Sequence, residues 1–215
     1  MIVLFNQIKR QPHPSYEFIH NGKIIATARG LVGEECPTLN MNGEEFEIPL
    51  RSYKGKDDFG NSVPHIYDVL KSGNSVGIIY QGVIPQKKIL FIQIGYGYYG
   101  LKLSNQTYYG YEIGFGEDEH YLCIKLNDKT ICIVHKTDRV VNCLDTYTMY
   151  LENDDDLIVG MLFALYFENA NYEDSYEEMD NGSDDTSCIT TQKKLNAHYD
   201  STFIPRIKAL NNIAE

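Results

Sequence analysis

The feature that most constrains this chain is an apolar run of 11 residues at positions 157–167, with the sequence LIVGMLFALYF. Aspartates occupy positions 154–156 before it, and Glu168 follows it. A helix of this composition has no polar face, so it needs protein on every side. It would be about 16 Å long at 1.5 Å per residue, whereas a membrane-spanning helix needs ~20 apolar residues. We therefore predict a helix over residues 155–167 that is buried inside the protein, with Met161, Leu162, Phe163 and Leu165 almost inaccessible to solvent.

The rest of the first 151 residues has the pattern of a β protein. The chain has 17 Tyr, 9 Phe and no Trp, and aromatic enrichment favours strands. Asn21-Gly22 and Asn42-Gly43 are strong signals for hairpin turns. A short helix is expected at residues 64–71, ended by Gly73. Strands are expected at residues 16–20, 23–29, 44–50, 76–83, 87–94, 98–103, 107–115, 120–126, 129–135 and 145–151. Their regular spacing predicts an antiparallel sandwich or barrel.

The C-terminal part differs in composition from the rest. Eight acidic residues and no Lys or Arg lie between Glu168 and Asp185, so most of the net charge of −11 belongs to this stretch. We interpret residues 169–192 as an acidic, flexible linker. Residues 193–215 form a weakly amphipathic segment, in which Ile207, Leu210 and Ile213 recur every third position. This segment could dock on its own domain or bind a partner.

The order of these elements carries a resemblance to a known family. Its sequence basis is the segment YTMYL at residues 147–151, then Asp155-Asp156-Leu157, then the apolar residues 158–167. This arrangement resembles the tubby C-terminal-like superfamily, which includes the LURP-one-related proteins, the phospholipid scramblases and small bacterial proteins. The resemblance implies an all-β fold over residues 1–168, with a closed antiparallel β-barrel of about twelve strands enclosing one central hydrophobic helix. It also implies a peripheral membrane or phospholipid-binding role, which eukaryotic tubby domains perform through clustered Lys and Arg. In this chain the basic residues are scattered, and Lys9-Arg10 and Lys87-Lys88 are the densest pairs before the tail.

Charge and cysteine content bear on partners and location. With 19 basic and 30 acidic residues, the chain is unlike proteins that bind nucleic acid or anionic membranes. Polar residues interrupt the apolar N-terminus from Asn6 onward, so no signal peptide is expected, and five cysteines form no disulfide framework. These features predict a cytoplasmic protein without a transmembrane segment. A composition rich in Asn, Tyr, Ile and Lys is typical of an AT-rich bacterial genome.

One glycine motif resembles a nucleotide-binding loop. Residues 95–100, GYGYYG, match the dinucleotide-binding pattern GxGxxG. That motif requires a helix directly after it, to place phosphate at the helix N-terminus. Here another alternating segment follows, at residues 101–105. We therefore predict that these glycines permit tight turns, bulges or barrel bends beside bulky tyrosines.

Two Cys/His pairs have the spacing of a zinc site. His120 and Cys123 are three residues apart, as are Cys132 and His135. If Asn127-Asp128 is a two-residue turn, Cys123 faces Cys132 on one side of the sheet. His120 then faces His135 on the other side. The four side chains could converge on one ion only if a bulge changed this register.

No residue is assigned a catalytic, cofactor-binding or metal-binding role. The sequence has no GxSxG nucleophile motif, and no cysteine in a reactive setting is recognisable. The leading hypothesis is a non-catalytic cytoplasmic binding or scaffold module that engages a protein partner through its acidic tail. The alternatives are a peripheral phospholipid-binding protein of the tubby or scramblase type and an enzyme with an unrecognised site.

Overall fold

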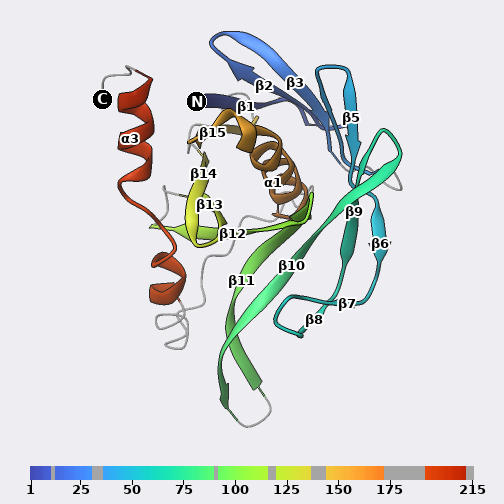
Figure 1. Ribbon diagram of the computed structural model, residues 1–215, viewed down its shortest axis with the longest axis vertical. Helices are drawn as coiled ribbons and strands as arrows, with labels where there is room; N and C mark the ends of the chain where they lie inside the picture. Colours follow the sequence, from blue (N-terminus) through green and yellow to red (C-terminus); the bar gives the residue numbers. More distant parts are fainter. Residues whose placement is uncertain are drawn as a thin grey trace.

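The computed structural model describes residues 1–10, 13–30, 36–89, 92–115, 120–136, 144–171 and 192–211 (Figure 1). The strands are β1 (Ile2–Lys9), β2 (Ser15–His20), β3 (Lys23–Arg29), β4 (Thr38–Met41), β5 (Glu44–Glu47), β6 (Leu50–Ser52), β7 (Gly55–Lys56), β8 (Ser62–Val63), β9 (Ile66–Lys71), β10 (Asn74–Ile89), β11 (Ile92–Leu103), β12 (Gln106–Gly114), β13 (His120–Leu126), β14 (Lys129–Lys136) and β15 (Thr146–Leu151). A 3-10 turn at Asp154–Asp156, helix α1 (Leu157–Asn171) and helix α3 (Phe203–Leu210) follow.

The strands form a closed antiparallel barrel, as expected. Twelve of them pair in the order β10-β11-β12-β13-β14-β15-β1-β2-β3-β4-β5-β9, and β9 also pairs with β10, which closes the ring. Short β6 extends the pairing of β5 along the same edge of β9. The ring itself has no unpaired edge. Beyond Tyr80 and before Tyr99, however, β10 and β11 pair only with each other and extend from the ring as a two-stranded arm (Figure 1).

The tight turns are confirmed at the residues that predicted them. Asn21 and Gly22 both have positive φ angles, of 50° and 72°, and the Asn42-Gly43 pair is similar. Two consecutive residues with positive φ define the hairpin turn whose twist matches that of the flanking strands. Asn127 and Asp128, with φ of 50° and 63°, form the same kind of turn between β13 and β14.

Two local predictions were wrong. Residues 64–71 do not form a helix: they contain strand β9, which pairs with β10, β5 and β6. Pairing on both edges outweighs a weak local helix preference. The separate strands expected at 76–83 and 87–94 are also not observed, because β10 runs without a break through Pro85 to Ile89. Pro85 lies at a register shift in this strand, where a missing N–H donor is tolerated.

Helix α1 is longer than predicted and begins later. It covers Leu157–Asn171, and the aspartates at 154–156 form a 3-10 turn before it. Asn153 precedes that turn, but its side chain makes no capping hydrogen bond. The predicted burial is confirmed, since Met161, Leu162, Phe163 and Leu165 are all 0% exposed. None of the described helices has the length and apolar composition needed to cross a bilayer.

Barrel residues from several strands contact α1. The rings of Tyr67 on β9 and Tyr99 on β11 pack edge-on against Tyr166 of α1. Gly160 of α1 lies against Met149 and Cys132, on β15 and β14. These residues belong to one apolar core cluster that includes α1 and the inward-facing side chains of the strands.

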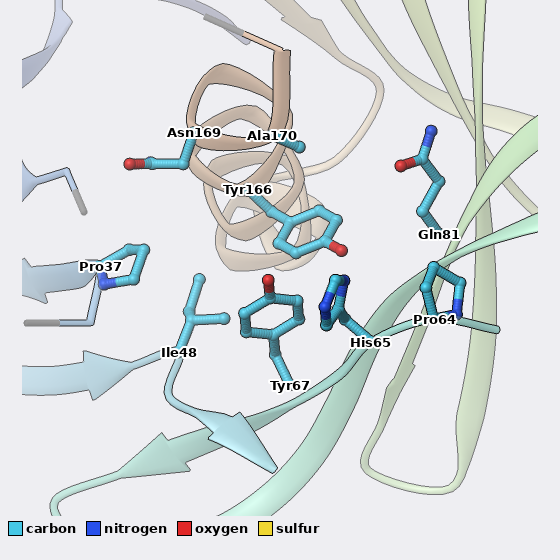
Figure 2. A pocket seen from close by; sticks show the side chains of 9 residues that line it. All are labelled: Pro37, Ile48, Pro64, His65, Tyr67, Gln81, Tyr166, Asn169 and Ala170. Carbon is cyan, nitrogen blue, oxygen red and sulfur yellow. The ribbon is translucent and has the colours of Figure 1, made fainter. Parts of the chain in front are cut away.

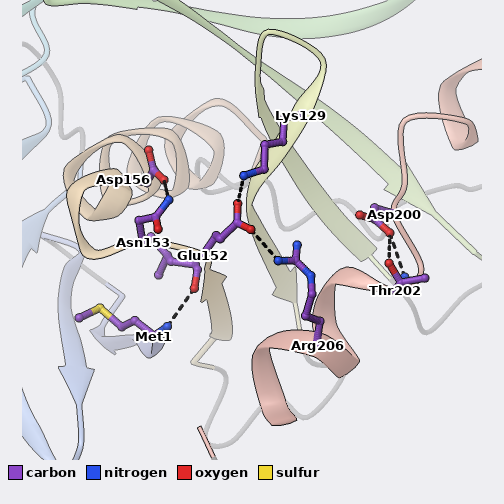
Figure 3. A network of polar contacts seen from close by, with 9 residues as sticks. Met1, Lys129, Glu152, Asn153, Asp156, Asp200, Thr202 and Arg206 are labelled. Carbon is purple, nitrogen blue, oxygen red and sulfur yellow. Dashed lines mark hydrogen bonds and ion pairs between the residues drawn. The ribbon is translucent and has the colours of Figure 1, made fainter. Parts of the chain in front are cut away.

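Residues 192–211, here called the strap, pack on the outer face of the barrel (Figure 1). Phe203 and Ile207 of α3 are 0% exposed and belong to a second apolar cluster with Cys123 and Ile133. Arg206 forms an ion pair of 2.6 Å with Glu152, which also pairs with Lys129 (Figure 3). The strap therefore docks on its own domain. Leu210, predicted to lie on its apolar side, is 68% exposed.

Candidate functional site

The inward-facing side chains change from apolar to polar toward the end of the barrel where α1 ends. On β12, Glu112 lies on the same face as Tyr108, which belongs to the core around α1. On β13, His120 lies on the same face as Leu122 and Ile124. We call this end the mouth, and its polar residues are Gln7, Tyr16, Gln81, Tyr99, Glu112, His120, Lys136, Asp145 and Glu168. Polar groups that converge beside an apolar core are typical of a binding site.

Glu168 lies in the last turn of α1 and is only 2% exposed. Its carboxylate accepts hydrogen bonds from the hydroxyl groups of Tyr147 and Tyr16. Burial is the main cause that raises its pKa to about 7, and the hydrogen bond from Tyr147 opposes this shift. The carboxyl therefore changes its protonation near neutral pH. Glu168, the first of the eight acids between positions 168 and 185, is therefore buried in α1. The linker expected at residues 169–192 begins later, because α1 continues to Asn171, and residues 172–191 lie outside the described residues.

Lys136 and Asp145 form the ion pair that lies closest to this carboxyl. Their side chains are 3.1 Å apart and are 16% and 20% exposed. Gln7 joins Asp145 to β1 through two hydrogen bonds, of 2.9 Å from its backbone N–H and 3.3 Å to its side-chain oxygen. The positive charge of Lys136 is therefore already balanced by Asp145.

Two cavities open at the mouth. The first has a volume of about 280 Å³ and lies beside the last turns of α1 (Figure 2). The rings of Tyr67 and His65 lie opposite Tyr166, while Asn169 lines the cavity from the helix (Figure 2). Tyr67 and Tyr166 meet edge to face, with ring centroids 5.4 Å apart. We call this the Tyr166 cavity.

The second cavity, here called the Glu112 cavity, has a volume of about 340 Å³. It is lined by Gln81, Gly97, Tyr99, Glu112, Gly114, His120, Gln192 and Leu195. The Tyr99 hydroxyl donates a 3.3 Å hydrogen bond to Glu112 Oε2. Burial raises the pKa of the Glu112 carboxyl, and the bond from Tyr99 partly offsets this shift. Gln81 lines both cavities, so the two lie next to each other.

A larger cavity of about 820 Å³ lies along β2 to β5, with Arg29 and Cys36 in its walls, and it adjoins the mouth at Tyr16. Residues 31–35, which join Gly30 to Cys36 in the sequence, lie outside the described residues.

The predicted pairing of the Cys/His residues was wrong. A bulge next to Ile131 shifts the register, so that Cys123 faces Ile133 and Cys132 faces Ile124. His135 faces Tyr121, on which it stacks at 4.6 Å. Cys132 lies in the core beside α1, while Cys123 lies on the opposite face, under the strap.

These residues do not converge on a metal. Among the described residues no group of three or more His, Cys, Asp or Glu side chains could hold an ion. Burial raises the pKa of the Cys123 thiol to about 12 and also raises that of Cys132, which disfavours the reactive thiolate. Cys143 and Cys188 lie outside the described residues.

Residues 95–100 all lie in β11, which runs without a break from Ile92 to Leu103, so no turn separates strands at 87–94 and 98–103. Gly100 faces Tyr80 and Gly82 faces Tyr98 across the β10–β11 pair. A Cβ atom at Gly100 would lie 2.5 Å from Cζ of Tyr80. The glycine is therefore needed to accommodate the ring.

Sequence reasoning missed Glu112 and Glu168. Residues on both faces of β12 are largely apolar or aromatic, so alternation alone did not show which face pointed inward. The available signal for Glu168 was that it directly follows an all-apolar run without a helix-ending residue. Comparison with family models, with curated proteins and with solved structures finds no match for this chain.

Proposed function

We propose that the chain is a non-catalytic binding module whose barrel encloses α1, and that it holds a basic protein partner at the mouth. The support for enclosure is that residues 159–168 of α1 are all buried, and that their neighbours come from strands on different sides of the ring. An enclosed helix would fill the lumen with side chains. Ligands would then be limited to the ends of the barrel.

The observation that carries the choice of partner is where the acidic segment is attached. The chain leaves the described part at Asn171, directly after Asn169 and Ala170, which line the Tyr166 cavity. It returns at Gln192, which lines the Glu112 cavity. The sequence between these two points carries seven acids and no Lys or Arg. A concentration of negative charge there would attract a basic partner and speed its association.

Titration with a lysine-rich peptide tests this proposal. The protein would be the full chain, and the comparison variant would carry Asn or Gln at the acids in positions 173–185. We expect saturable binding that weakens as salt increases from 0.05 to about 0.15 M, and that is largely lost in the variant. Binding that is equal in both chains would contradict a role for the acidic segment.

Flotation with anionic vesicles tests the phospholipid alternative, which rests on the resemblance to tubby-like proteins. The net charge of −11 predicts that the protein stays unbound at physiological salt. Flotation with the vesicles, together with no binding of the lysine-rich peptide, would overturn the proposal in favour of a lipid-binding protein. Turnover of a substrate would likewise overturn the non-catalytic role.

A further inference from the structure

We propose that the Glu112 cavity is a binding site for an alkylammonium group, the chemistry of a lysine side chain or a free alkylamine. This inference rests on the proposed function and deepens it by naming the group that the mouth recognises. It is carried by the contacts of Glu112 and by the shape of the cavity.

Glu112 is a mostly buried carboxylate whose charged form is favoured by His120, in the same cavity, and by Lys136. The hydroxyl of Tyr99 donates a hydrogen bond to Oε2 of Glu112. No hydrogen bond to the other oxygen, and no ion pair with this carboxylate, occurs within the described part of the chain. The nearby Lys136 pairs with Asp145 instead. A mostly buried carboxylate is stabilised strongly by a cation that reaches it.

The remaining walls suit an alkyl chain that ends in an ammonium group. The ring of Tyr99 and the side chain of Leu195 provide apolar surface. The amides of Gln81 and Gln192 provide further oxygens, and an ammonium group has three hydrogens to donate. A volume of about 340 Å³ is at the lower end of the range for small-ligand sites.

Gly97 keeps the cavity open. Gly97 lies on the same face of β11 as Tyr99 and lines the cavity. A Cβ atom on Gly97 would meet nothing closer than the carbonyl oxygen of Gly82, at 4.0 Å. A larger side chain at this position would therefore project into the space that the ligand needs, without clashing with the backbone.

The geometry also favours lysine over arginine. A guanidinium group binds a carboxylate best through both oxygens at once. Since Tyr99 already donates to Oε2, a bidentate guanidinium would have to share that oxygen with the hydroxyl. A single ammonium group needs only one oxygen.

The test is a titration followed through backbone amide resonances of the full chain by NMR. The probe is Nα-acetyl-lysine methylamide, and the neutral comparison is Nα-acetyl-norleucine methylamide. We expect saturable shifts at the amides of Gly97 and Gly114 with the lysine probe, weaker shifts with the matching arginine compound, and none with norleucine. Equal shifts with lysine and norleucine, or none with either, would overturn the inference.

Two variants locate the site and one serves as a control. Glu112→Gln should lower the affinity for the lysine probe by about tenfold or more, because the change removes a charge-assisted hydrogen bond. Gly97→Leu should block the cavity while keeping its charge. Glu45→Gln, an exposed residue on β5, removes the same charge elsewhere and should leave the affinity unchanged. If Glu45→Gln lost as much affinity as Glu112→Gln, the net charge alone would explain the loss. That result would contradict a site at Glu112.

Titration with n-butylamine and with the lysine-rich peptide distinguishes the source of the ammonium group and separates the two proposals. If Glu112→Gln weakens the binding of both butylamine and the peptide, the cavity takes a lysine side chain of the partner. If Glu112→Gln weakens the binding of butylamine alone, the cavity takes a free amine. If the peptide binds wild type and Glu112→Gln equally and no small amine shifts Gly97, the cavity is not an ammonium site, while the proposed function stands. If the peptide does not bind wild type at all, the proposed function fails.

Discussion

Glu168 is the buried residue whose protonation most directly affects stability. Its folded pKa of about 7 lies above the ordinary value of 4.5, because burial disfavours the charged form. The folded protein therefore holds this proton more tightly than the unfolded chain does. The free energy of unfolding should fall as pH rises from about 4.5 to about 7, by about 3 kcal/mol from this group.

Replacement of Glu168 by Gln isolates this contribution. The amide has nearly the same shape but does not titrate, so the variant should lose the fall in unfolding free energy between pH 4.5 and 7. The measurement is denaturant unfolding of both proteins at several pH values. Tyr16, Tyr147, Lys136 and Asp145 surround the group in both proteins, so their contributions cancel in the difference. An identical pH dependence of the two proteins would contradict the account of Glu168.

Gly100 and Gly97 form a matched pair for testing packing in β11. Gly100→Ala should lower the free energy of unfolding by about 1–3 kcal/mol, because the new methyl group displaces the ring of Tyr80. That ring is 1% exposed, and its hydroxyl donates a 2.9 Å hydrogen bond to Asp58, which would be strained. Gly97→Ala, with open space around it, should change stability by less than about 0.5 kcal/mol. Equal destabilisation by the two changes would show that strand propensity, not the ring contact, decides the effect.

At the scale of single elements, α1 is the part on which the barrel depends most. Leu162→Asp should abolish folding, because a buried, unpaired charge costs several kcal/mol, comparable to the whole stability of a domain. Leu162→Met keeps the volume and should cost less than about 1.5 kcal/mol. Circular dichroism and thermal melting would compare the two. A Leu162→Asp protein that melts cooperatively like the wild type would contradict enclosure of the helix.

The strap is held mainly by Phe203 and Ile207. Phe203→Ala should release it, because the change removes a large, fully buried side chain from the second apolar cluster. Amide hydrogen exchange should then speed up across residues 192–211, while the strands of the barrel keep their protection. Leu210→Ala, at a position that is 68% exposed, is the matched control and should leave exchange unchanged. Unchanged exchange in Phe203→Ala would mean that other contacts, such as that of Arg206 with Glu152, hold the strap.

At the scale of the whole molecule, the sequence predicted those parts that depend on local chemistry. The Asn-Gly turns and the burial of α1 follow from backbone preferences and from an apolar run with no polar side. The positions of Cys123 and Cys132 did not follow, because one extra residue near Ile131 puts the two cysteines on opposite faces of the sheet. The mouth could not be predicted either. Its residues come from strands far apart in sequence, and their meeting depends on the register around the whole barrel.

Native-state hydrogen exchange of α1 tests the central claim, that the helix is enclosed and that binding is therefore confined to the mouth. An enclosed helix can exchange its amides only when the barrel opens. We predict that the opening free energy obtained from exchange of the amides of residues 159–167 equals the free energy of global unfolding measured by denaturant. The opening free energy of the strap should be smaller. Exchange of α1 through a local opening, with a free energy well below the global value, would contradict the central claim.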